Sequence, residues 1–111
     1  LGRMNDLYIE IEQLNKEYNF HYDEDNNLIC SIVRSDNINE IQAILTITFQ
    51  SYQPTQIQHV KLSLHQSSSN SSHVHFNQQE EIEQSLKDIY QNQQYGQLTS
   101  ICQCIKQALY Q

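Results

Sequence analysis

The sequence has no tryptophan, one proline, two glycines and no long apolar run, and these shortages exclude several classes of protein. Gly2 and Gly96 are too far apart to form a glycine-rich loop around a phosphate. No apolar stretch approaches the roughly 20 residues that a membrane-spanning helix needs, and no signal-like segment opens the chain. We therefore expect neither a phosphate-binding glycine loop nor a membrane span.

Basic residues are also scarce, because six Lys and Arg stand against 13 Asp and Glu, for a net charge of −7. The phosphates of a nucleic acid and the surface of an anionic membrane both repel such a chain. No cluster of Lys or Arg offsets this repulsion. The composition therefore predicts a protein partner with a basic surface, and neither a nucleic acid nor a membrane.

The cysteines are Cys30, Cys102 and Cys104, an odd number without the spacing of a disulfide framework. This pattern favours reduced thiols in an intracellular compartment, which we expect to be the cytoplasm. The pairs Cys102-x-Cys104 and His73-x-His75 invite comparison with metal ligands. Residues two apart on a helix diverge, however, and two histidines do not complete the four ligands of structural zinc. We expect no metal and no cofactor.

A chain of 111 residues forms one domain and can bury a core without a metal or a disulfide. Two interpretations of Leu1–Met4 stay open, which are extra residues before a native Met4 or the start of a domain cut from a longer protein. Gln and Asn make up about a quarter of the chain, with 17 and 10 copies. They are scattered through patterned segments, so we interpret them as solvent-facing residues.

The stretch Ile41–Leu64 organises the rest of the chain. Apolar residues alternate with polar ones over Ile41–Phe49 and again over Val60–His65, which predicts two strands of a sheet with one dry face. The single proline, Pro54, lies between them, where a missing N–H does the least harm to strand pairing. At this corner we expect the ring of Tyr52 to pack under the turn while its hydroxyl holds a backbone group.

The flanking segments supply further strands and three helices. Leu7, Ile11, Leu14 and Tyr18 follow helical spacing, and Asn77 with Glu80 has the form of a capping box at a helix start. The expected elements are a helix over 5–18 capped by Asn5 or Asp6, a short strand or link over 19–22, an acidic turn over 23–27, a strand over 28–34, a turn from Ser35 to Asn37, a flexible loop over 67–72, an extended piece over 73–76, a helix from Asn77 to about 91 and a helix over 97–110.

The predicted fold class is α+β. A helix is followed by a three- to four-stranded antiparallel meander, and two C-terminal helices then pack on one face of the sheet.

Three strings in this order resemble the RWD domain, a family named for its occurrence in RING-finger proteins, WD-repeat proteins and DEAD-like helicases. Glu10–Tyr18 (EIEQLNKEY) resembles the first helix of the family, and Phe49–Pro54 (FQSYQP) resembles its corner. The segment from Tyr95 to Leu109, which begins YGQLTSI, resembles its last helix. The resemblance implies the fold of ubiquitin-conjugating enzymes without their chemistry.

Three functions follow from this resemblance. The first is a non-catalytic protein–protein interaction module, as an adaptor domain of a kinase, a ubiquitin ligase or a translation-stress regulator. The second is a small structural subunit of a large assembly. The third is a degenerate conjugating enzyme, which would need a nucleophilic cysteine just beyond the sheet. The residues after Leu64 read HQSSSNSSHVHFN and contain no cysteine, so we expect no enzymatic activity.

Acidic residues off the apolar stripe of the first helix, together with the acidic turn, form the candidate partner-binding surface. The resemblance implies such a role because several members of the family contact basic partners near this helix. The alternative is a solvated helix face. The turn lacks the glycine and the final glutamate of a calcium loop. The candidate residues are Glu10, Glu12, Glu17, Asp23, Glu24 and Asp25.

Overall fold

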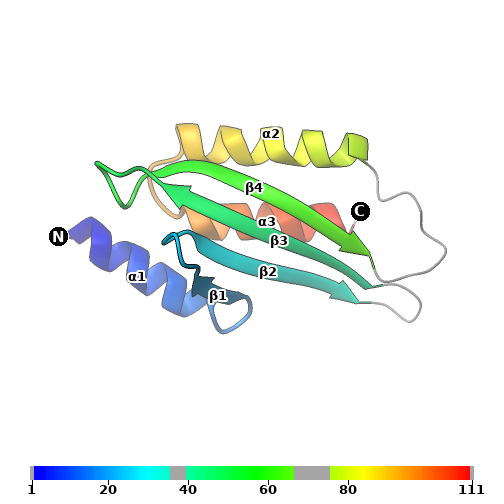
Figure 1. The fold of residues 1–111 in the computed structure, drawn as a ribbon, viewed down its shortest axis with the longest axis horizontal. Coiled ribbons are helices and arrows are strands. Elements are labelled where there is room, and N and C mark those ends of the chain that lie inside the picture. Colours follow the sequence, from blue (N-terminus) through cyan, green and yellow to red (C-terminus); the bar gives the residue numbers. More distant parts are fainter. Residues whose placement is uncertain (1, 36–39, 67–75, 111) are drawn as a thin grey trace.

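The computed structural model describes residues 2–35, 40–66 and 76–110 as an α+β fold (Figure 1). A helix, four antiparallel strands and two further helices follow one another, so the predicted order is confirmed, with four strands in the sheet. The elements are α1 (Gly2–Leu14), β1 (Asn19–Tyr22), β2 (Leu28–Ser35), β3 (Glu40–Phe49), β4 (Ile57–Gln66), α2 (Phe76–Asn92) and α3 (Gln97–Leu109).

The strands form a meander in which each one pairs with the next along the chain. The register aligns alternating residues of neighbouring strands, so that Cys30 lies opposite Leu45, and Leu45 opposite Leu62. All three side chains are buried. The predicted dry face is therefore correct, and Ala43, Leu45 and Ile47 of β3 form its centre.

β4 begins three residues earlier than the alternation predicts, and a β-bulge explains why. The register shifts between Thr48, which pairs with His59, and Phe49, which pairs with Ile57. One extra residue on β4 changes which way the preceding residues point. Ile57 therefore shares the buried face with Val60 although the two are an odd number of positions apart.

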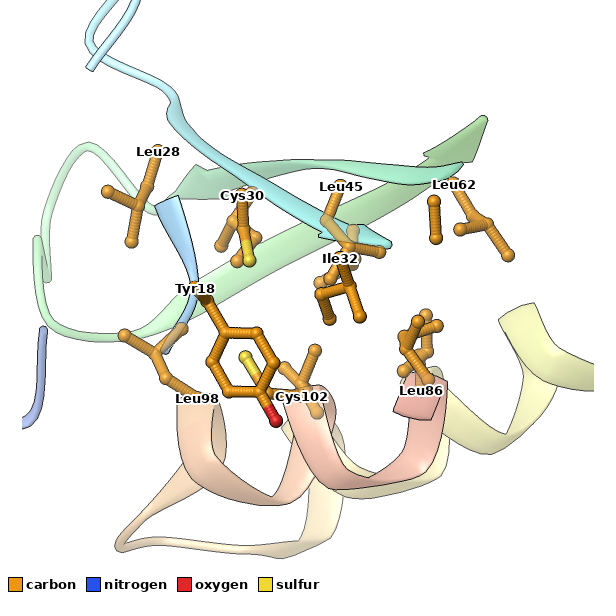
Figure 2. Packing of buried hydrophobic residues seen from close by; sticks show 14 of the residues in the cluster. Tyr18, Leu28, Cys30, Ile32, Leu45, Leu62, Leu86, Leu98 and Cys102 are labelled. Atoms are coloured by element: carbon orange, nitrogen blue, oxygen red, sulfur yellow. The ribbon is translucent and has the colours of Figure 1, made fainter. Parts of the chain in front are cut away.

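The two C-terminal helices cover this dry face. In Figure 2, Cys30, Leu45 and Leu62 extend from the sheet toward the helices, and Leu86 of α2 and Cys102 of α3 extend toward the sheet. The stripe predicted for the last helix is buried as expected. Partly buried residues of α1, namely Leu7, Ile11 and Leu14, pack at the margin of the same core.

The C-terminus of α3 is capped by a charged side chain from another element. Arg34 of β2 donates from Nη1 to the Leu109 carbonyl oxygen at 2.5 Å. The same guanidinium lies 5.3 Å from the centre of the Tyr110 ring. A cation there complements the partial negative charge of the last helical carbonyls. The interaction ties β2 to the end of α3.

Several glutamines have structural roles that composition does not reveal. Gln97 is buried, and its Nε2 donates to the carbonyl oxygens of Tyr90 and Gln93 at the end of α2. Gln79 of α2 donates from Nε2 to the Leu62 carbonyl of β4 at 3.0 Å. The interpretation of the amides as solvent-facing residues is therefore wrong for these positions. Each of the two glutamines donates to backbone carbonyls of another segment and so ties two parts of the fold together.

The first helix is displaced relative to its prediction. α1 spans Gly2–Leu14, so Asn5 and Asp6 lie inside it and do not cap it. The Oδ1 atom of Asn15 accepts a hydrogen bond from the Phe20 backbone N at 2.7 Å, in the turn that leads from α1 into β1. Tyr18 is still buried, but it reaches the core from this turn and not from the helix.

The predictions for the start of the second helix and for the corner also need correction. α2 begins at Phe76, so Asn77 is a helical residue and not the N-cap, and Phe76 is not extended. The side chain of Tyr52 is 95% exposed, so its ring does not pack under the turn. Gln50 and Gln56 close this loop instead, through a backbone hydrogen bond of 2.9 Å. Three other predictions fall wholly or partly outside the described residues. They are the turn at positions 36–37, the flexible loop over 67–72 and the extended piece at positions 73–75.

Leu45 offers a direct test of the dry face. We expect Leu45→Ala to lower the free energy of unfolding by about 2–5 kcal/mol, because it removes buried methyl groups and leaves a cavity. Val33→Ala removes methyl groups from a half-exposed site of the same sheet and should cost about 1 kcal/mol or less. Urea unfolding measures both. Equal losses would show that the two faces are not distinguished by burial.

Candidate functional site

A cleft lies where three segments that are distant in sequence meet. Figure 1 shows these segments at the same end of the molecule. These are α1, the loop between β3 and β4, and the start of α3 with the link that precedes it. The cleft has a volume of about 450 Å³, which is enough to take one or two large side chains.

Apolar and acidic side chains share the walls of this cleft. Phe49 and Leu7 are partly buried, whereas Ile9 and Tyr95 expose 52% and 69% of their surface. Asp6 and Glu10 of α1 supply the negative charge. A partly apolar pocket next to carboxylates can hold an apolar side chain and a neighbouring basic group.

Glu10 has a second role, because it caps the N-terminus of α3. The N-cap residue is Gly96, whose positive φ of 66° suits glycine and which has no side chain to accept a hydrogen bond. Glu10 Oε2 instead accepts from the backbone N of Thr99 at 3.0 Å and from its Oγ1 at 2.6 Å. A carboxylate also complements the partial positive charge of a helix N-terminus. The contact joins α1 to α3 across 89 residues of sequence.

The other predicted acidic residues lie elsewhere. Glu12 is exposed and does not line the cleft, since residues two apart on a helix point about 200° apart. Glu17 Oε1 lies 2.6 Å from Lys106 Nζ of α3, in an ion pair whose side chains are about half exposed. Such surface pairs contribute only about 0–1 kcal/mol to stability.

The side chain of Asp23 stabilises its own turn through hydrogen bonds. Its Oδ1 accepts hydrogen bonds from the backbone N of Asp25 and of Asn27, at 2.9 and 2.8 Å. These bonds lower the pKa of the Asp23 carboxyl, with the bond from Asn27 as the largest cause. Asn26 completes the turn with a positive φ of 63°. Glu24 and Asp25 are exposed beside it.

The structure thus brings only one of the six predicted partner-binding residues, Glu10, to the cleft. The other side chains that line the cleft come from segments far apart in the chain, and no local pattern joins them. The one signal in the sequence is Ile9, an apolar residue that lies off the apolar stripe of the first helix.

Two of the three thiols lie together in the core. Cys30 of β2 and Cys102 of α3 are fully buried (Figure 2). Cys104 is half-buried. The pKa of the Cys102 thiol is raised, mainly by a hydrogen bond with Cys30 and next by burial. Burial also raises the pKa of the Cys104 thiol. Reactive cysteines need a lowered pKa and access to solvent. Cys102 and Cys104 therefore lack the properties of a nucleophile.

No protein-family model, curated protein sequence or solved structure matches the chain. The link to the ubiquitin-conjugating-like fold is therefore one of topology, namely an N-terminal helix, a four-stranded antiparallel meander and two C-terminal helices.

Within the described ranges, no group of three or more His, Cys, Asp or Glu side chains could hold a metal ion. No described helix is both long and apolar enough to cross a bilayer.

The link between Glu10 and Thr99 can be tested by its stability. We expect Glu10→Ala to lower the free energy of unfolding by about 0.5–2 kcal/mol, because a helix cap is lost. Glu12→Ala, on the exposed face of the same helix, should cost about 0.5 kcal/mol or less. In a double-mutant cycle, Glu10→Ala and Thr99→Val should be non-additive. Equal effects of Glu10→Ala and Glu12→Ala would contradict the capping role.

The burial of the thiols predicts an order of chemical reactivity. In the native protein at pH 7.5, an aromatic disulfide reagent should modify Cys104 slowly and leave Cys30 and Cys102 unmodified until the core opens. All three should react at once in concentrated urea. Cys104→Ser should abolish the native-state reaction. Modification of Cys102 at the rate of Cys104 would contradict the packing of the core.

Proposed function

We propose that this chain is a non-catalytic protein–protein interaction module whose docking site is the cleft between α1 and the start of α3. The observation that supports this best is the composition of the cleft. It combines exposed apolar groups, Ile9 and Tyr95, with the carboxylates of Asp6 and Glu10. Apolar anchors in a pocket supply most of the affinity of protein interfaces, and charges at the rim select the partner.

The partner that fits this cleft presents one large apolar side chain next to a lysine or an arginine. The apolar group would fill the space between Ile9 and Phe49, and the cation would face the acidic side of α1. A chain with a net charge of −7 also attracts a basic protein over a longer range. The resemblance to RWD domains points the same way, since these are interaction modules. An adaptor domain of a kinase, a ubiquitin ligase or a translation-stress regulator is the setting it implies.

The state of the thiols supports a function without thioester chemistry. A conjugating enzyme needs an accessible cysteine that forms a thiolate near neutral pH. Cys30 and Cys102 are buried in the core, and burial raises the pKa of Cys104. We expect no reductant-sensitive adduct when the chain is incubated with ubiquitin, ubiquitin-activating enzyme and ATP. Formation of such an adduct would overturn the proposal.

Docking in the cleft can be tested with matched variants on α1. The chain is immobilised, proteins are captured from a cell lysate at low salt, and the affinity of each is then measured with the purified protein. We expect Asp6→Lys to weaken binding of the partner by about tenfold and Glu12→Lys to weaken it less, although both make the same change of charge. Tyr95→Ser should also weaken binding by about tenfold, through the loss of an apolar contact.

Tyr52→Ser serves as the control for Tyr95→Ser, because Tyr52 is 95% exposed and lies outside the cleft. Affinities that respond equally to Asp6→Lys and Glu12→Lys, and do not respond to Tyr95→Ser, would show that binding depends on net charge and not on the cleft. Glu10 is left unchanged in this experiment, because its loss would also uncap α3.

A further inference from the structure

The two fully buried thiols have no role in the proposed function, yet they lie against each other. Neither Cys30 of β2 nor Cys102 of α3 exposes more than 1% of its surface. A side-chain hydrogen bond joins them. Figure 2 shows the Cys30 side chain extending from the sheet toward α3, and the Cys102 side chain extending from α3 toward the sheet. Two sulfur atoms from different layers of the fold therefore meet inside the core.

The packing around Cys30 explains why α3 meets the sheet at this position. In the row of paired residues across the buried face, Cys30 lies between Phe20 of β1 and Leu45 of β3. Both neighbours are buried, and both have larger side chains than cysteine. Because protein interiors leave few voids, the space above the smallest member of the row must be filled from the helix layer. Cys102 fills it.

Hydrogen bonds at the two ends of α3 hold this contact in place. Arg34, on the same strand as Cys30, donates to the Leu109 carbonyl oxygen at 2.5 Å. Glu10 of α1 accepts from the Thr99 backbone N at 3.0 Å. Since α3 is fixed at both ends, Cys102 stays opposite Cys30. Two groups held in this way react with each other far more readily than with a group on a second molecule.

We propose that Cys30 and Cys102 form a redox-sensitive pair, which a hydroperoxide converts into a disulfide that joins β2 to α3. In the first step, the thiolate of one cysteine attacks the peroxide and the O–O bond breaks, which gives a sulfenic acid and an alcohol, or water from hydrogen peroxide. The sulfur of the other cysteine then attacks the sulfenic sulfur. The S–O bond breaks, and the hydroxide leaves as water with the proton of the second thiol. Two thiols are thereby oxidised and one peroxide is reduced.

The surroundings of the pair decide when it reacts and with what result. Only a thiolate attacks a peroxide, so the raised pKa of the Cys102 thiol favours the reduced form until an oxidant is present. The oxidant reaches the buried sulfurs when the core opens locally. A disulfide is about 2.05 Å long, so its formation draws α3 slightly closer to β2. The cross-link then opposes unfolding, because it restricts the unfolded chain.

Cys104 does not compete for either sulfur. It lies two positions from Cys102 on the same helix, where side chains point about 200° apart. It is half-buried, whereas the pair is fully buried. The native structure therefore specifies one pairing among the three that the cysteines allow.

The test oxidises the full chain with hydrogen peroxide, blocks the remaining thiols with N-ethylmaleimide in urea and analyses tryptic peptides by mass spectrometry. Cys30 lies in the peptide 17–34, and Cys102 and Cys104 lie in the peptide 88–106. We expect one main product, in which these two peptides are joined and which dithiothreitol separates. Cys104→Ala should retain this product, and Cys102→Ala, its matched control, should lose it.

A second measurement does not depend on the variants. Oxidation in concentrated urea should give a mixture of the three pairings and of linked chains, because no structure then selects one of them. The chain oxidised in its native state should unfold at a urea concentration about 1 M or more above that of the reduced chain, and dithiothreitol should reverse the shift.

Several results would overturn the proposal. They are the same mixture of pairings in the native state and in urea, a main native product that contains Cys104 or links two chains, sulfinic acids without a disulfide, and a lower urea midpoint after oxidation. None of these measurements involves the cleft, so they leave the proposed function untouched, and loss of partner binding in the cleft variants leaves this pair untouched.

Discussion

The structure depends on keeping one face of a single β-sheet out of water. Each strand contributes apolar side chains to that face, and the central strand β3 contributes Ala43, Leu45 and Ile47 without any exposure. A sheet cannot bury a face by itself, so α2 and α3 must lie across it. Burial of apolar area at about 25 cal/mol per Å² is the main force that holds these layers together.

Charged side chains then fix where α3 lies within this layer. Glu10 of α1 satisfies the N-terminal end of the helix and Arg34 of β2 the C-terminal end, each with the charge that suits the helix dipole. The apolar stripe of α3 alone would allow it to slide along the sheet, because the hydrophobic effect is not directional. Hydrogen bonds at both ends are directional, and they set the position of the helix. The same position forms the wall of the cleft next to Glu10 and Gly96.

The position of α3 also decides the character of the cleft, because it brings the carboxylates of α1 beside exposed apolar groups of the link before the helix. The buried thiol pair contributes to packing between β2 and α3 and lies away from the cleft.

The sequence by itself determined the fold class, because the alternation of Ile41–Phe49 and the stripe of the last helix are local patterns that set which side chains must be buried. It also predicted the acidic turn around Asp23. Only the tertiary structure decided the contacts of Glu10 with Thr99 and of Arg34 with Leu109, which join residues 89 and 75 positions apart. The cleft is decided in the same way, since its walls come from three distant segments. The bulge that turns Ile57 inward depends on pairing with β3, and no pattern within β4 alone specifies it.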